Sequence, residues 1–194
     1  MVQYMWGVFI PMKNKSYANR GMFLEHIIND TNTYYLSKDK AVIYKKPTPI
    51  KVLNVKYRTA KTTLIDKAVF SETSTLDYNG IYKGKYIEFD AKECKSTTSF
   101  PLNNIKKHQI THISNIIKHG GIVFLIIFMN NNFYLFKGSS LLEFINNTER
   151  KSIPFDYIKK NAYIIKEGYM PRIDYLTVVD NVYLKEGDYD ISKK

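Results

Sequence analysis

The stretch that decides the fold is Leu76–Lys95, LDYNGIYKGKYIEFDAKECK. It predicts two β-strands, Leu76–Tyr82 and Lys85–Cys94, on either side of Lys83-Gly84. Glycine tolerates the positive φ that a two-residue hairpin turn requires, so we expect the strands to pair antiparallel. Tyr82 then faces Lys85, and the numbers of paired residues sum to 167.

This register places Asp77 directly opposite Asp90, and Thr75 opposite Lys92. Opposed side chains have Cβ atoms about 4.5 to 5.5 Å apart, a distance at which like charges destabilise a sheet. Two facing carboxylates therefore call for a cation, and oxygen ligands suit Mg²⁺ or Mn²⁺. Two alternatives stay open: both acids are ordinary solvated strand residues, or a bulge shifts the register and separates them.

Alternation along the second strand places Ile87, Phe89 and Ala91 on a core face and gives the opposite face a row of charge: Glu88, Asp90 and Lys92. The spacing acid, any residue, lysine recurs at Glu93–Lys95 and Glu149–Lys151. Glu93 and Lys95 project from the other face of an ideal strand, and Glu149–Lys151 lies in a polar turn. The row with Asp90 and Lys92 is therefore the catalytic candidate.

A helix is predicted over Ile105–His119, with Asn103 or Asn104 as its N-cap. Gln109 interrupts its apolar stripe, so its carbonyl is a candidate metal ligand or water contact. The alternative is a core glutamine bonded to backbone. No Glu follows His108, so the zinc-protease motif is absent, and we expect His108 and His112 to face solvent or phosphate.

The remaining pattern indicates a single α/β domain over residues 1–194, beginning with an apolar N-terminal arm at 1–18. We expect these further elements: helices Arg20–Asn32 and Leu141–Asn147, and strands Ala41–Lys45, Ile122–Met129, Phe133–Lys137, Tyr163–Lys166 and Tyr175–Val179.

Composition excludes some classes and favours one kind of partner. The 194 residues carry 29 Lys+Arg against 18 Asp+Glu, a net charge of +11, which favours a polyanion such as nucleic acid. The charge could also serve solubility alone. The longest apolar run is too short to span a membrane. The one cysteine fits a cytosolic protein.

Part of the charge is concentrated in the segment at about residues 45–70. Pro47 and Pro49 disfavour a central strand or a long helix there, so we expect a basic projection from the core. An ordinary long basic loop is the alternative.

The sequence resembles the RecU family of Holliday junction resolvases along most of its length. Blocks that carry the resemblance include NRGM at 19–22, KPTPI at 46–50, STLDYNG at 74–80, FDAK at 89–92, HQ at 108–109 and PRIDY at 171–175. The resemblance implies a restriction-endonuclease-like mixed sheet flanked by helices, a homodimer, and a protruding stalk that engages a four-way DNA junction.

The resemblance also implies residue roles. The family's Mg²⁺-binding positions match Thr75, Asp77, Asp90 and Gln109, and Lys92 matches its transition-state-stabilising lysine. The family usually has Glu where this chain has Asp90, which shortens that ligand by one methylene. Recombinases and branch-migration proteins are candidate partners. The candidate DNA contacts are Arg20, Lys45, Lys46, Lys51, Lys56, Arg58 and Lys61.

Three functions compete at this stage. A junction resolvase combines metal-dependent hydrolysis with a dimer, and a sequence-specific restriction-type enzyme of the same fold would also read base edges in the major groove. An architectural junction binder would need only the basic surface. The motif order and the projection favour the resolvase, and the acids with Lys92 favour an enzyme over a passive binder.

Overall fold

The computed structural model describes residues 22–57, 59, 62–70 and 75–184. The N-terminal arm at 1–18 and the candidate DNA contacts Arg20, Arg58 and Lys61 lie outside the described residues. Among the described residues, no helix has the length and apolar character needed to cross a membrane.

A mixed six-stranded sheet forms the centre of the molecule, in the order β1-β4-β5-β7-β8-β10. Only β5 and β7 pair in parallel among these neighbours, and helix α2 lies between them in sequence. The bounds are β1 Val42–Lys45, β4 Tyr78–Tyr82, β5 Lys85–Glu93, β7 Ile122–Met129, β8 Asn132–Lys137 and β10 Ala162–Ile165. A mixed sheet flanked by helices, as expected from the sequence, is confirmed.

The β4–β5 hairpin has the predicted register, with Tyr82 opposite Lys85 and Tyr78 opposite Phe89. Lys83 has φ 48° and Gly84 φ 73°, so both turn residues adopt the left-handed conformation that a tight hairpin needs. The ladder ends at Tyr78, one residue after Asp77.

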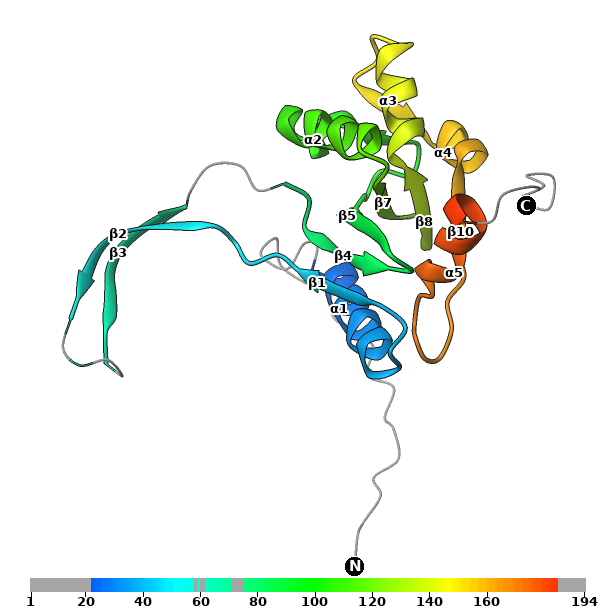
Figure 1. Ribbon diagram of the computed structural model, residues 1–194. Helices are drawn as coiled ribbons and strands as arrows, with labels where there is room; N and C mark the ends of the chain where they lie inside the picture. The colour runs from blue at the N-terminus through cyan, green and yellow to red at the C-terminus, as the bar shows by residue number, and fades with distance from the viewer. Residues whose placement is uncertain (1–21, 58, 60–61, 71–74, 185–194) are drawn as a thin grey trace, which may run out of the picture.

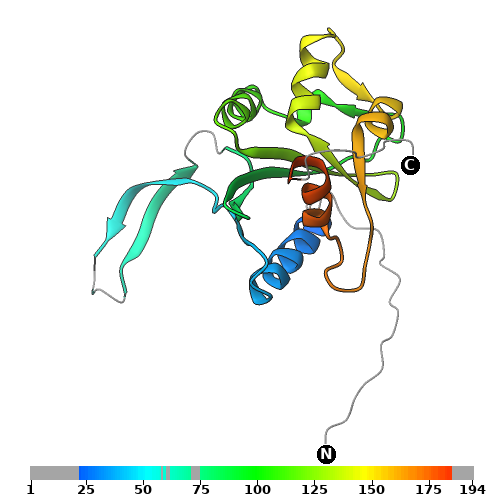
Figure 2. The same ribbon diagram turned by 45° about the vertical axis from the view of Figure 1, so that its right-hand side comes forward.

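Helices cover both faces of the sheet (Figures 1 and 2). One face packs Phe89 and Phe124 against α1 (Met22–Ser37), α5 (Tyr175–Val179) and the π-helical turn Asp180–Leu184. The other packs Val123, Leu125 and Ile127 under four elements: α2 (Lys107–Lys118), α3 (Gly138–Asn146), α4 (Phe155–Asn161) and the β6–β9 pair (Ser99–Pro101 with Ser152–Pro154). Because Glu88 and Asp90 pair with Val123 and Leu125, the row of charge lies on the α2 face.

A separate two-stranded hairpin, β2 (Ile50–Lys56) with β3 (Leu64–Phe70), extends away from this body (Figure 1). Its described side chains are exposed apart from the half-buried Val55. The projection expected at about residues 45–70 is therefore present, and it is a β-hairpin rather than an irregular loop.

Several predicted elements differ from the structure, among them the helix expected at Leu141–Asn147, which begins earlier, at Gly138. Residues Tyr175–Val179 form helix α5 and not a strand. The β-branched residues favour a strand, but the Asp174 side chain accepts a hydrogen bond from Thr177 N and caps a helix whose buried positions follow helical spacing. Helix α1 extends to Ser37, beyond the expected end at Asn32, and α2 has Lys106 as its N-cap because Leu102–Asn104 forms a separate 3₁₀ turn.

Candidate active site

Asp77 and Asp90 meet at the open end of the β4–β5 hairpin, as the register predicts, and their side chains are hydrogen-bonded. Asp90 is fully buried. Its Oδ1 accepts the Ala91 amide at 3.0 Å, and its Oδ2 accepts Gln109 Nε2 at 2.9 Å and Lys92 Nζ at 2.8 Å. Strand alternation and the two-residue turn thus bring two acids and one lysine together.

This pair carries an excess of negative charge. Burial, the hydrogen bond to Asp90 and the charge of Asp90 together raise the pKa of Asp77 to about 7, although the charges of Lys92 and Lys45 oppose this shift. At neutral pH Asp77 is therefore partly protonated, and a cation bound nearby would lower its pKa.

The segment that carries Asp77 is fixed by its backbone. The Lys46 amide donates to the Asp77 carbonyl at 2.7 Å. The Lys46 ammonium donates to the Thr75 hydroxyl. Thr75 therefore lies two residues before Asp77 in the chain, and Lys46, the first residue after β1, holds its hydroxyl.

Gln109 reaches the site from the first turn of α2. Its Nε2 donates to Asp90, while its Oε1 accepts the Lys106 amide at 3.0 Å. The carbonyl is therefore bonded to backbone, as in the alternative stated from the sequence, and the amide nitrogen orients Asp90. Its role as a metal ligand stays a prediction.

Sequence reasoning missed Glu88, the second fully buried acid of β5. Its Oε1 accepts the Lys46 ammonium and the Leu76 amide, the latter at 3.1 Å. Its Oε2 accepts the Tyr86 hydroxyl at 2.6 Å and lies 3.0 Å from His112 Nε2. The alternation of β5 placed Glu88 on the site face, but nothing in the sequence pattern paired it with Lys46 or His112.

The bonds to Glu88 outweigh its burial. Burial alone would raise the pKa of Glu88, but hydrogen bonds from Lys46, Tyr86 and His112 hold that pKa below its usual value. The expectation that His112 faces solvent or phosphate is wrong, because its ring contacts this buried carboxylate.

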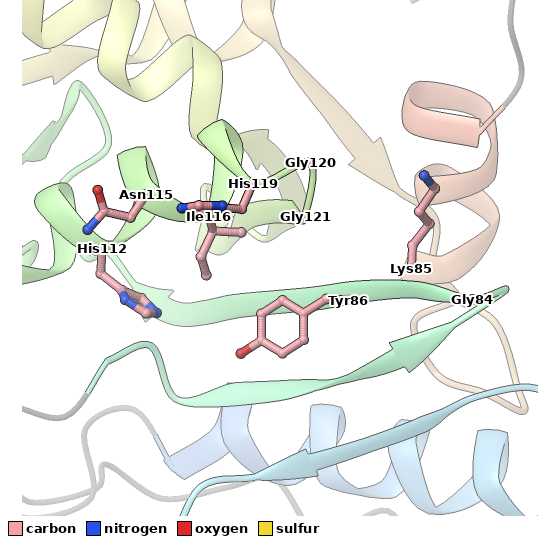
Figure 3. A pocket seen from close by; sticks show the side chains of 9 residues that line it. All are labelled: Gly84, Lys85, Tyr86, His112, Asn115, Ile116, His119, Gly120 and Gly121. Carbon is pink, nitrogen blue, oxygen red and sulfur yellow. The ribbon is translucent and has the colours of Figure 1, made fainter.

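Tyr86 and His112 also line a cavity of about 540 Å³ between the start of β5 and the end of α2 (Figure 3). Figure 3 shows the Tyr86 ring lying below α2, with His112 projecting down from the helix and His119 just after the end of the helix. We call Glu88 and its partners Lys46, Leu76, Tyr86 and His112 the Glu88 cluster, and two of its members thus line this cavity.

Most of the described DNA-contact candidates make ion pairs within the chain. Lys45 pairs with Glu25, Lys46 with Glu88, and Lys56 with Asp66 at 2.7 Å. Lys51 is exposed on the hairpin. Their roles in DNA binding stay predictions.

The donor set at the acid pair fits a hard divalent cation. Within the described part of the chain, no three His, Cys, Asp or Glu side chains gather as a metal site. Mg²⁺ is commonly held by one or two carboxylates, with waters and substrate phosphate completing its shell. Asp77 and Asp90 supply two such carboxylates, and the charge of Asp90 together with burial raises the pKa of Asp77.

The model of one protein family, described as RecU, recombination protein U, matches residues 19–181. The chain belongs to the RecU family. The resemblance seen in the sequence motifs is thereby confirmed, and the matched span includes the acid pair, Lys92, the Glu88 cluster and the hairpin.

Relatives within the RecU family are similar over most of their length. A protein of Geobacillus kaustophilus named Holliday junction resolvase RecU is 49% identical over 172 residues, covering 86% of each chain. The protein of the same name from Bacillus subtilis is 47% identical over 171 residues, covering 87% of this chain and 83% of that one. A solved structure of Hjc, a Holliday junction resolvase from Archaeoglobus fulgidus, aligns with TM-score 0.43 and 11% identity, over 71% of this chain and 91% of that one.

Proposed function

We propose that the protein is an endonuclease that resolves four-way (Holliday) DNA junctions in recombination and repair. The observation that carries this proposal is the Asp77–Asp90 pair beside Lys92, in a chain of the RecU family. A passive junction binder would have no use for two facing acids in which Asp90 raises the pKa of Asp77. The site thus favours an enzyme over the architectural alternative.

Asp77 and Asp90 are the residues that would hold Mg²⁺, with Thr75 and Gln109 adjacent, and Mn²⁺ is a possible substitute. The bound ion would polarise the scissile phosphate and lower the pKa of a water molecule. Asp77 gives up its proton when positive charge is supplied, because its pKa of about 7 reflects burial and the neighbouring Asp90 charge. Gln109 fixes the orientation of Asp90 through its amide nitrogen.

Lys92 is the lysine of this chain that would place a positive charge beside the scissile phosphate. Its ammonium lies 2.8 Å from Asp90 Oδ2 and is held at the edge of the pair. Hydrolysis of a phosphodiester adds negative charge to the phosphoryl oxygens and the leaving oxygen. A fixed ammonium stabilises that charge most strongly in the transition state.

Symmetric resolution of a junction requires two cuts, and one site makes one cut, so we infer a homodimer. The hairpin supports this inference because it exposes large apolar side chains that a second copy could cover: Ile50, Val52, Leu53, Tyr57, Leu64, Ile65, Val69 and Phe70. Sedimentation analysis of the full chain should give twice the monomer mass. A monomer that cuts both strands would contradict this inference.

The same hairpin is the candidate shape reader, because it projects from the body and carries exposed Lys51. Ile50 and Phe70 are opposite one another, so residues 51–69 can be replaced by a two-residue turn. We expect a variant shown to remain folded and dimeric to lose its preference for four-way DNA while it keeps some affinity for duplex through the rest of its basic surface. An unchanged ratio of junction to duplex affinity at fixed salt would remove the hairpin from recognition.

We also propose a cytoplasmic location, because DNA undergoing recombination is found there in bacteria such as the named relatives.

The test of the whole proposal is cleavage of a labelled four-way junction beside a linear duplex of matched sequence, with Mg²⁺, Mn²⁺ or EDTA. We expect paired cuts in the junction with either metal, none with EDTA, and little cutting of the duplex. Cutting of the duplex at one sequence would favour the restriction-type alternative. Binding of the junction without cutting under all conditions would favour the architectural one.

A further inference from the structure

A groove of about 640 Å³ begins at Lys92 and lies between the end of β5 and the segment that leads into α2. The residues that matter for its chemistry are Lys92, Lys95, Asn103, Asn104 and Lys106, and we call it the Lys92 groove. It adjoins the acid pair through Lys92, which is ion-paired with Asp90, and extends away from that pair to Lys95 and the asparagines.

The side chains of the Lys92 groove are suited to an anion. Lys95, Lys106 and both asparagines are exposed, so their ammonium and amide groups are accessible to a ligand. Glu93 is the one acid that lines it, and its Oε1 is bonded to the Leu24 amide at the start of α1. Lysines therefore dominate both walls.

Helix α2 adds to this positive field. Its N-cap is Lys106, its first residue is Lys107, and its first turn contains no acid. The N-terminus of a helix carries partial positive charge and unpaired amide groups, which favour phosphate. A helix of 12 residues begins at the rim of the Lys92 groove with its positive end.

The dimensions fit a nucleic acid strand. From Lys92 to Lys95 the chain can span at most about 10 Å, at about 3.3 Å per extended residue. A DNA strand carries one phosphate per about 3.4 Å of helix axis, so this length corresponds to about two or three phosphates. The groove is continuous with the scissile position at one end because Lys92 belongs to both.

We propose that the Lys92 groove binds the phosphodiester backbone of the strand being cut, on one side of the scissile phosphate. Lys95 and Lys106 would contact successive phosphates, and the asparagines would donate hydrogen bonds to backbone oxygens. The proposal deepens the proposed function and rests on it. It gives the cut strand a fixed path away from the acid pair, in addition to the contacts that the hairpin makes elsewhere.

The chain offers a matched control for the loss of charge. Lys95 and Lys106 lie at the end of β5 and the start of α2, whereas Lys85 and Lys118 lie at the start of β5 and the last turn of α2. The double variant Lys95→Ala/Lys106→Ala should weaken junction binding about 10-fold near physiological salt, and should make log affinity less steep in log salt by about 1.5. Lys85→Ala/Lys118→Ala removes the same charge and should leave both quantities near those of the unaltered protein.

The decisive measurement locates the contact on the DNA. Junctions are made with a single neutral methylphosphonate at each position within four nucleotides of the cut, on either side. The unaltered protein should lose affinity at two or three successive positions on one side. Lys95→Ala/Lys106→Ala should be insensitive at those positions only, and Lys95→Arg/Lys106→Arg should regain the sensitivity.

The outcomes separate this inference from the proposed function. If the unaltered protein fails to cut junctions, the proposed function fails. If it cuts, but the lysine-to-alanine double variant retains the full pattern of methylphosphonate sensitivity, the Lys92 groove does not bind the strand. Equal losses of affinity in both double variants would also overturn the inference, since they would reflect total charge alone.

Discussion

Glu88 and Asp90 lie two residues apart on β5, both fully buried on the α2 face, yet their surroundings differ in electrostatic balance. Four donors surround Glu88, and its pKa is lowered. Asp90 faces a second acid, and the pKa of that acid, Asp77, is raised to about 7. Burial alone therefore does not set the charge balance of these two carboxylates, because Asp90 faces a second acid and Glu88 does not.

The largest expected effect is the loss of junction cleavage when a charge is removed at the acid pair or at Lys92. Asp77→Asn, Asp90→Asn and Lys92→Ala should each reduce junction cleavage by at least about 10² to 10³, since each removes charge that acts on the phosphoryl oxygens directly or through a bound cation. Junction binding should persist, because the basic surface is largely unchanged. Asp90→Glu should stay active, as it keeps the charge and changes only the reach. Near-normal cleavage by the Asp77 and Lys92 variants would reject the assigned site.

The next effect is a difference between Glu88 and Asp90 in their contribution to the free energy of unfolding. Glu88→Ala should lower the free energy of unfolding by about 3 kcal/mol, because it leaves Lys46 and the Leu76 amide without their buried acceptor. In metal-free protein Asp90→Ala should cost less than half as much, because loss of its bonds is offset by relief of repulsion with Asp77. Urea unfolding in EDTA measures the free energy of unfolding of both variants. Equal losses would contradict the proposed difference between Glu88 and Asp90.

The pH dependence of stability should have opposite signs at the two acids. The folded-state pKa of Asp77, about 7, exceeds its ordinary value of 3.8, so its contribution is complete below about pH 4 and is lost as pH rises towards 7. The pKa of Glu88 is depressed below 4.5, so its contribution is present above that pH and is lost as pH falls through the folded-state pKa. Thermal unfolding in EDTA should show both slopes.

Two variants test whether these changes of stability with pH come from Asp77 and Glu88. Asp77→Asn should remove the loss of stability between about pH 4 and 7, and Glu88→Gln should remove the loss in acid. Saturating Mg²⁺ should abolish only the slope that belongs to Asp77. A Glu88→Gln protein with the acid loss intact would assign that loss to other groups, Asp174 among them, whose pKa is also lowered.

The smallest effect tests which of the two carboxylate oxygens of Glu88 helps to position the acid pair. Tyr86→Phe removes one donor to Oε2 and leaves both bonds to Oε1, so it should cost about 1 kcal/mol and leave the metal dependence of cleavage unchanged. Lys46→Met removes the donor that also holds Thr75, and should raise the Mg²⁺ concentration needed for half-maximal cleavage. Equal metal requirements in both variants would show that Oε1 does not position the acid pair.

The β4–β5 register was predictable because a two-residue turn and strict alternation leave one pairing of Asp77 with Asp90. The projection was predictable from Pro47 and Pro49, but its pairing was not, because the β2–β3 register contains irregularities around Asn54. Helix α5 was mistaken for a strand because the cap from Asp174 outweighs the β-branched residues. Local propensity alone does not decide such a short segment.

The Glu88 cluster was not predictable because its partners come from three separate elements. Lys46 follows β1, Leu76 precedes β4, and His112 is on α2, so only the tertiary fold brings them to one carboxylate. Sequence spacing locates acids that face each other across one turn. It does not locate the cations that neutralise an acid from a distance along the chain.

The tight turn at Lys83-Gly84 has a consequence for folding kinetics. Hairpin formation takes on the order of 1 to 10 μs, and pairing that starts at a two-residue turn advances away from it. Asp77 and Asp90 lie beyond the last ladder pair, Tyr78 with Phe89, so they are the last residues that this zipping brings together. We therefore expect their repulsion to act on the final step of hairpin closure and not on its start at the turn. Variants that neutralise Asp77 should change the unfolding rate far more than the folding rate.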